Sequence, residues 1–143
     1  KYPFHLISPH PRYGYHTHYD AHCKWLWEIP EHRVIVDDNP YIVVRINPEN
    51  AKQKGIKEGD IIKVFNDRGV VLGIARVTDR VRKNVIHCYC SSGIYRPLEH
   101  GKPGSPDRGG CINILTPARH LSKNVPGMAP NSCLVDVAKW EGE

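Results

Sequence analysis

Glycine and proline interrupt this sequence so often that long helices are excluded from most of it. The chain carries 12 glycines and 12 prolines in 143 residues, and a proline inside a helix removes a hydrogen-bond donor and clashes with the preceding turn. Between these breaks lie short runs of β-branched and other apolar residues, as in 41–46 and 70–77. This pattern disfavours a helical bundle and favours many short strands joined by structured loops.

The runs between the breaks define six predicted strands and one well-bounded helix. Asn47 can cap a helix whose first residue is Pro48, and Gly55 lies where a left-handed C-terminal cap belongs, so we expect a helix over 48–54. Two tryptophans in 23–29 favour a helical turn over the core. Together these elements predict a mainly β fold, a closed β-barrel with small inserted helices. The predicted strands cover 4–7, 41–46, 61–66, 70–77, 85–89 and 134–139.

Length and charge limit the classes of partner. A chain of 143 residues is long enough for one compact domain, which we expect to cover 1–143. Its net charge of +5 suits an anionic ligand. The basic residues are nevertheless spread along the chain rather than gathered in a run, and no stretch approaches the roughly 20 apolar residues of a membrane-spanning helix. We therefore expect neither nucleic acid nor a membrane as a partner.

A segment rich in histidine and proline, residues 8–18, is the first candidate binding site. It follows a predicted strand and contains donors at nearly every second position, together with a glycine that lets backbone approach a ligand. The planar guanidinium of Arg12 suits a phosphate group. The segment therefore favours recognition of a polar, phosphate-bearing ligand, although a polar loop whose histidines bond to nearby backbone explains it equally well. The further donors are His10, His16, Thr17 and His18.

A metal site is a weaker interpretation of the same region. Histidine and cysteine side chains bind zinc and copper, and four of them occur close together. Their spacing matches no closed structural zinc site, so we expect the chain to bind no metal through its own residues. The five cysteines of the chain are an odd number, and we expect them to be reduced and structural. The four potential metal ligands are His16, His18, His22 and Cys23.

A second candidate site lies in residues 109–116. Gly109 and Gly110 permit close approach of the backbone to a ligand, and the amide of Asn113 can donate and accept hydrogen bonds at once, which suits the edge of a heterocycle. On spacing alone, a turn leading into a buried turn or strand is the more favoured interpretation. The chain has no Walker-type loop and no glycine fingerprint that opens a helix.

Several motifs occur in an order typical of one family. They are Ser-Pro-His-Pro-Arg at 8–12, His-Thr-His at 16–18, the blocks at 44–51 and 55–64, Asn-Asp-Arg-Gly at 66–69, and Gly-Cys-Ile-Asn-Ile-Leu-Thr at 110–116. The chain resembles the C-terminal molybdopterin-dinucleotide-binding domain of the dimethyl-sulfoxide-reductase superfamily of molybdenum and tungsten enzymes, and within it the transhydroxylase-like subgroup. The resemblance implies a six-stranded double-psi β-barrel, of the aspartate-decarboxylase-like class. It also implies a ligand, molybdopterin guanine dinucleotide, whose pterin carries molybdenum or tungsten.

The resemblance also implies which residues contact this cofactor. The segment after the first strand would contact the pterin and the diphosphate, and a second loop would border the cofactor. No catalytic residue is implied, because the protein ligand of the metal lies in another domain of the family's enzymes. The implied contacts are His10, Arg12, His16, Thr17, His18, Gly93, Tyr95 and Asn113.

The same resemblance implies a place in a larger protein. We expect the chain, which begins with Lys1, to be the C-terminal part of a larger catalytic subunit and to be inactive alone. Its partners would then be the pterin cofactor and the remaining domains, with an iron–sulfur subunit as a further candidate. A cytoplasmic or a periplasmic location in a bacterium or archaeon fits equally. The alternative is a stand-alone barrel with a binding or assembly role.

Overall fold

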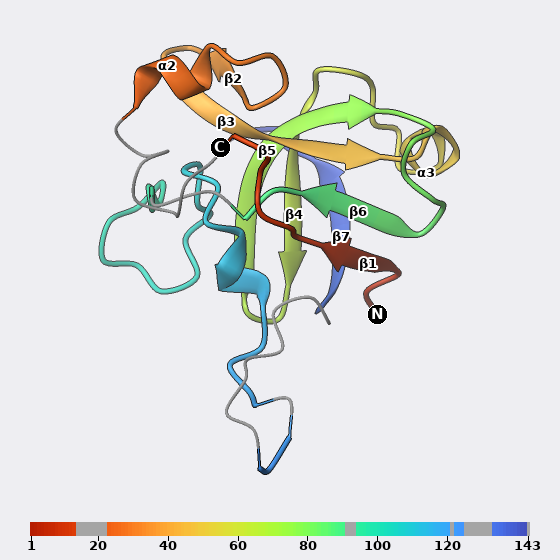
Figure 1. Cartoon of the computed structure of the whole chain (residues 1–143), viewed down its shortest axis with the longest axis vertical. Helices are drawn as coiled ribbons and strands as arrows, with labels where there is room; N and C mark the ends of the chain where they lie inside the picture. The colour runs from red at the N-terminus through yellow and green to blue at the C-terminus, as the bar shows by residue number, and fades with distance from the viewer. Residues whose placement is uncertain (14–22, 91–93, 121, 125–132, 143) are drawn as a thin grey trace.

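A computed structural model describes residues 1–13, 23–90, 94–120, 122–124 and 133–142 (Figure 1). The described chain is mainly β, with two short α-helices and one 3-10 helix. No helix in these ranges combines the length and the hydropathy that crossing a membrane requires. The helices are α2 (Lys24–Trp27), α3 (Pro48–Gln53) and η1 (Ile112–Leu115). The strands are β1 (Phe4–Ile7), β2 (Arg33–Val36), β3 (Asn39–Ile46), β4 (Ile61–Asn66), β5 (Gly69–Val77), β6 (Val85–Cys88) and β7 (Cys133–Lys139).

Six of the strands close into a barrel. They follow one another in the order β3, β5, β4, β7, β1 and β6, and β6 pairs back onto β3. The pairs β1–β6 and β3–β5 are parallel, and the other pairs in the ring are antiparallel. β2 lies outside the ring and forms a hairpin with β3. The prediction of a mainly β, closed six-stranded barrel with small helices is confirmed, and the pairing is consistent with the double-psi description.

The interior of the ring is filled by alternate residues of its strands. In β4 and β7 the buried positions recur at every second residue, as expected for strands with one face in a core. Gly73 of β5 shows how tightly this core is packed. A Cβ atom added there would lie 2.6 Å from Cγ2 of Val44 on the neighbouring strand. Fully buried side chains of the ring include Leu6, Val44, Ile62, Val64, Val71, Ile86, Val135 and Val137.

The helix α3 forms for the local reasons that the sequence indicates. The side-chain oxygen of Asn47 accepts a hydrogen bond from the backbone N–H of Glu49 at 3.0 Å, and Pro48 is the first helical residue. At the other end Gly55 adopts a positive φ of 65°. The N–H groups of Gly55 and Ile56 return to the carbonyls of the last turn, as in a Schellman motif. The helix ends at Gln53, one residue before the predicted end.

Two features of residues 23–38 differ from the predictions. α2 covers no core, because none of its residues is buried and Trp25 is 82% exposed. β2 is a strand that the sequence analysis did not predict. It pairs with a β3 that begins at Asn39 rather than at residue 41, across a two-residue turn. Both turn residues, Asp37 and Asp38, have positive φ, as the turns that suit the twist of a hairpin require.

Candidate functional site

The segments that follow β1 and β6 meet at one end of the barrel. The two strands are parallel neighbours, so both segments leave the ring at the same end. The backbone N–H of Cys90 donates to the carbonyl of Pro9 at 3.0 Å, and Sγ of Cys90 lies 3.7 Å from Nδ1 of His10. Figure 1 shows residues 8–13 after β1, helix α2, residues 94–111 after β6 and η1 on the side of the barrel away from α3. The described part of the first candidate segment, residues 8–13, therefore lies on the same side of the molecule as the second candidate segment, residues 109–116.

A pocket of about 180 Å³ opens between the segment after β1 and the wall of the barrel. Its walls come from residues 11–13, residues 29–32, Arg45 of β3 and Tyr89 just after β6. Two cations there lie over aromatic rings. The guanidinium carbon of Arg12 is 5.5 Å from the ring centre of Tyr13, and that of Arg45 is 5.1 Å from the ring centre of Tyr89. The pocket thus combines positive charge with aromatic surface.

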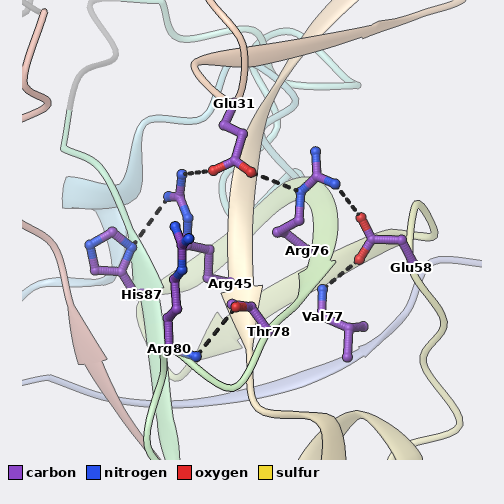
Figure 2. Close-up of polar contacts among 8 residues, drawn as sticks. All are labelled: Glu31, Arg45, Glu58, Arg76, Val77, Thr78, Arg80 and His87. Carbon is purple, nitrogen blue, oxygen red and sulfur yellow. Dashed lines mark hydrogen bonds and ion pairs between the residues drawn. The ribbon is translucent and has the colours of Figure 1, made fainter.

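A chain of polar contacts ties residues 29–32 to the barrel (Figure 2). Glu31 accepts a hydrogen bond from Nη2 of Arg45 at 3.0 Å, and its other oxygen lies 3.7 Å from Nε of Arg76. Arg76 in turn donates to Glu58 at 2.7 Å, and Nη1 of Arg45 lies 3.4 Å from Nδ1 of His87. The carboxylate of Glu31 is therefore occupied by the protein's own arginines, and it does not leave the pocket with an unpaired negative charge.

In these surroundings the pKa values of Glu31 and His87 are both lowered. The hydrogen bond from Arg45, followed by the positive charges around it, lowers the pKa of Glu31 despite some burial. Burial, followed by the charge of Arg45, lowers the pKa of His87. At neutral pH Glu31 is thus ionised and His87 is uncharged, so the arginines next to the pocket face no additional cation from this histidine.

The loop between residues 94 and 111 is organised by one buried carboxylate. Asp107 has no exposed surface. Its Oδ1 accepts from the backbone N–H groups of Arg96 and Gly109 at 2.7 and 2.9 Å, and its Oδ2 accepts from the N–H of Cys111 at 2.7 Å. Its own backbone extends the sheet, because its N–H donates to Val70 of β5. This residue fixes both arms of the loop relative to the barrel.

Arg33 is hydrogen-bonded to the backbone of the same loop. Its side chain is buried, and Nη1 donates to the carbonyls of Pro40 and Gly109 at 2.8 and 3.0 Å. Neither Asp107 nor Arg33 was predicted from the sequence as a site residue. Their burial arises where the loop of Asp107 meets strands that are distant from it in sequence, and neither residue carries a local sign of it.

The paired glycines approach the protein's own chain rather than opening toward a ligand. A Cβ atom added at Gly109 would lie 2.3 Å from the carbonyl oxygen of Ile94, and one added at Gly110 would lie 2.2 Å from Cγ2 of Ile42. Gly110 also has a positive φ of 85°. The two glycines are thus required by packing against loop backbone and a core side chain, and the predicted approach to a ligand stays a prediction.

The predicted contact residues divide into described and undescribed ones. His10, Arg12, Tyr95 and Asn113 all have exposed side chains, and of these Arg12 lines the pocket. Asn113 lies in η1, whose neighbouring residues Ile112 and Leu115 are buried, so this segment contains both the buried turn and the exposed amide that the sequence allowed. The other predicted contacts, His16, Thr17, His18 and Gly93, lie outside the described residues.

The weaker metal interpretation involves the same undescribed region. Of its four potential ligands only Cys23 lies in the described ranges. Among the described residues, no group of three or more histidine, cysteine or acidic side chains is placed to hold a metal ion. All five cysteines are free thiols. Burial raises the pKa of Cys88 to about 12, as expected for a cysteine whose side chain is packed in the core.

Comparison with known proteins identifies the family to which this arrangement belongs. The family model described as "Molydopterin dinucleotide binding domain" matches residues 4–134. The pyrogallol hydroxytransferase large subunit of Pelobacter acidigallici is 46% identical over 144 residues, which is all of this chain and 16% of that protein. The trimethylamine-N-oxide reductase of Haemophilus influenzae is 34% identical over 143 residues, again over 16% of its own length. The chain thus spans about a sixth of the length of these relatives.

A solved structure agrees on the fold. The acetylene hydratase from Pelobacter acetylenicus superposes on 97% of this chain and 18% of its own, with a TM-score of 0.55 at 15% sequence identity. The match of the family model over most of the chain, the identity to long relatives and the closed barrel confirm the resemblance and the molybdopterin dinucleotide cofactor that it implies. The chain belongs to the molybdopterin dinucleotide-binding domain family of the dimethyl-sulfoxide-reductase superfamily.

Proposed function

We propose that this domain holds molybdopterin guanine dinucleotide at the barrel end where the segments after β1 and β6 meet. The observation that carries the proposal is the pocket at Arg12, where two arginines and two tyrosines face one cavity. A diphosphate gains charge-assisted hydrogen bonds from a guanidinium. Aromatic rings give a flat heterocycle a surface on which to stack. Residues 11–13 of the first candidate segment line this pocket, which links the pocket to that segment.

The exposed donors of this region suit such a ligand. They are the guanidinium of Arg12, the imidazole of His10 and the amide of Asn113, which can bond to phosphate oxygens and to the edge of a heterocycle. The nearby carboxylates already have partners within the protein. Those of Glu31 and Asp107 are occupied by arginines and by backbone N–H groups. The donor set therefore fits a dinucleotide that is both anionic and heterocyclic.

Each predicted contact has a role in this proposal. The residues after β1 bind the diphosphate and the pterin, the loop after β6 borders the cofactor, and the amide of η1 bonds to a ring edge. The metal–pterin unit supplies redox chemistry when it is bound, while the protein binds and orients it. The residues assigned to these contacts are His10, Arg12, His16, Thr17, His18, Gly93, Tyr95 and Asn113.

The whole protein is proposed to be a molybdenum or tungsten oxidoreductase. This proposal is supported by relatives named as reductases and as a hydroxytransferase, of which the chain covers 16%. That share favours a domain of a larger catalytic subunit over a stand-alone barrel. The remaining domains of this subunit, and an iron–sulfur subunit, are its proposed partners, with no role for nucleic acid or for a membrane contact by this domain.

Binding of GDP, as a probe for the nucleotide half of the cofactor, tests the site. The amide signals of residues 8–13, 89–90 and 94–116 are expected to shift when GDP is added to the 143-residue chain. Arg12→Gln should weaken GDP binding about tenfold or more, because it removes a charge-assisted hydrogen bond worth roughly 1.5–3 kcal/mol. The measurement is a titration followed by NMR or calorimetry.

Arg82→Gln is the matched control for this test. It removes the same charge from an exposed position between β5 and β6, outside the pocket at Arg12. GDP affinity should therefore change little in that variant. Equal losses of GDP affinity in the two variants would show that binding depends only on the net charge of the chain. The absence of GDP-induced shifts at this end of the barrel would contradict the proposed site.

A further inference from the structure

We infer that Asp107 and Asn66 are positioning residues for Asn113, because they hold the two ends of η1 and so fix the backbone that presents its amide. This inference rests on the proposed function, since it takes Asn113 as a cofactor contact. Neither buried side chain needs to touch the ligand. Their effect on binding would pass through Asn113.

The entry to η1 is held by Asp107. Cys111, whose N–H donates to Oδ2 of Asp107 at 2.7 Å, is the residue directly before the helix. The same carboxylate binds the N–H of Gly109, while the carbonyl of Gly109 accepts from Arg33. A peptide segment bonded on both faces to buried charged groups has little freedom to rotate. The direction in which the chain enters η1 is thereby set.

The exit from η1 is held by Asn66, the last residue of β4. Its side-chain nitrogen donates to the carbonyl of Leu115 at 2.9 Å, and the same carbonyl accepts from Sγ of Cys133 at 2.8 Å. The oxygen of the Asn66 side chain accepts from the N–H of Arg68 at 2.9 Å, which orients the amide group. Because Asn66 and Cys133 are buried, water does not compete for these bonds.

The middle of η1 is packed against the barrel, while Asn113 is exposed. Ile112 and Leu115 are almost fully buried, and Ile114 is packed so closely on Gly69 that an added Cβ there would lie 2.5 Å from its Cγ2. The carbonyl of Asn113 accepts from both the N–H and the hydroxyl of Thr116, at 3.1 and 2.9 Å. The exposed amide is therefore attached to a backbone that is hydrogen-bonded at both ends and packed against the barrel.

A backbone that is ordered before binding reduces the entropy lost when the ligand is bound. Loosening either end of η1 should consequently weaken binding even where the barrel stays folded. The loss should depend on the Asn113 side chain, because that side chain makes the contact. This dependence separates a positioning role from a general contribution to stability.

A double-mutant cycle measures this dependence. Asp107→Asn keeps the shape of the side chain but replaces one acceptor oxygen by an NH2 group, so at least one of three backbone N–H groups loses its partner. We expect it to weaken GDP binding on the order of fivefold when Asn113 is present, and to add no further loss to Asn113→Ala. Equal losses in both backgrounds, or no loss in either, would overturn the inference.

Two further variants separate positioning from stability. Asp60→Asn alters another carboxylate that accepts a backbone N–H, from Lys57, and contacts Lys139, and it should lower the melting temperature without lowering GDP affinity. Thr116→Val is a milder change at η1 itself, for the case that Asp107→Asn does not fold. It removes the hydroxyl that bonds to the carbonyl of Asn113 and should give a smaller loss of affinity that again vanishes with Asn113→Ala.

The outcomes also distinguish this inference from the proposed function. If GDP binds and Arg12→Gln weakens it while Asn113→Ala does not, the positioning role is overturned and the site at Arg12 stands. If the unaltered chain binds no GDP, the proposed function is contradicted, and the positioning role is overturned with it.

Discussion

Glu31 ties one wall of the Arg12 pocket to two strands of the barrel. It adopts a positive φ of 65°, which is uncommon for a residue with a side chain, and its two oxygens face two arginines of different strands. Strained positions of this kind persist where the surroundings hold them. Here the bonds to Arg45 and Arg76 do so, and they keep residues 29–32 next to Arg12.

The stability that Glu31 contributes should depend on pH. Its pKa is lowered in the folded chain, first by the hydrogen bond from Arg45. A lowered pKa means stabilisation that is present above the unfolded value of about 4.3 and is lost as pH falls through the folded value. When the pH is lowered from about 5 to about 3, the free energy of unfolding of the Glu31→Gln variant should therefore fall less than that of the unaltered chain. Thermal or urea unfolding across this range measures the difference.

Glu28→Gln provides the comparison for this prediction. Glu28 carries the same charge three residues earlier and is exposed. The acid dependence of that variant should stay close to that of the unaltered chain. A Glu31→Gln variant with an unchanged acid dependence would show that the charge of Glu31, drawn in Figure 2 between Arg45 and Arg76, contributes nothing to folding.

Single residues also show what sequence could and could not reveal about the site. Arg12 and Asn113 could be selected because their side-chain chemistry suits an anionic heterocycle, and both are exposed in the folded chain. Asp107 could not be selected, since an aspartate within a stretch of glycine and proline resembles a solvated turn residue. Its burial is created by strand β5 and by the loop around it, which are distant in sequence.

At the scale of elements, α3 is determined by residues adjacent to it in the sequence, whereas β2 is determined by its pairing with another strand. The ends of α3 are set by Asn47, Pro48 and Gly55, which are adjacent to the helix in sequence, so the prediction was correct to within one residue. β2 depends on its pairing with β3 across a turn of two aspartates. This pair is a weaker hairpin signal than asparagine or aspartate followed by glycine, so the strand was not predicted.

Gly55→Val tests the cap of α3. A Cβ added at Gly55 meets no atom within 4 Å, so the cost arises from the positive φ of 65° alone rather than from a clash. A left-handed conformation costs an ordinary residue roughly 1–2 kcal/mol, and more for a β-branched one. The melting temperature should fall by several degrees, since about 1 kcal/mol shifts it by roughly 2–8 °C in domains of this size range.

Gly55→Asn separates conformation from side-chain size in the same experiment. Asparagine tolerates the left-handed region better than valine does, so its melting temperature should lie between those of the other two chains. Equal losses for valine and asparagine would argue against the cap as the cause.

At the scale of the whole molecule, the strands differ in how many neighbours hold them. Each strand of the ring is paired on both sides, whereas β2 pairs only with β3 among the described residues. Local opening is easiest where the fewest interactions must break. The amide protons of β2 that bond to β3 should therefore exchange with solvent faster than the bonded amides of β4 and β5.

Native-state hydrogen exchange measures this order directly. The slowest amides, in β4 and β5, should report opening of the entire barrel, while those of β2 should report a smaller, local event. Uniform exchange rates across all seven strands would show that the β2–β3 hairpin opens only together with the ring, and would contradict the expected local opening of β2.

The closed ring has a consequence for how this domain can change over evolutionary time. A closed ring tolerates few alterations in its strands, because each of its six strands must fit two neighbours and a filled interior. The segments that leave the ring carry no such double constraint. New ligand preferences can therefore arise by substitution or insertion in these segments, while the frame that supports them stays the same.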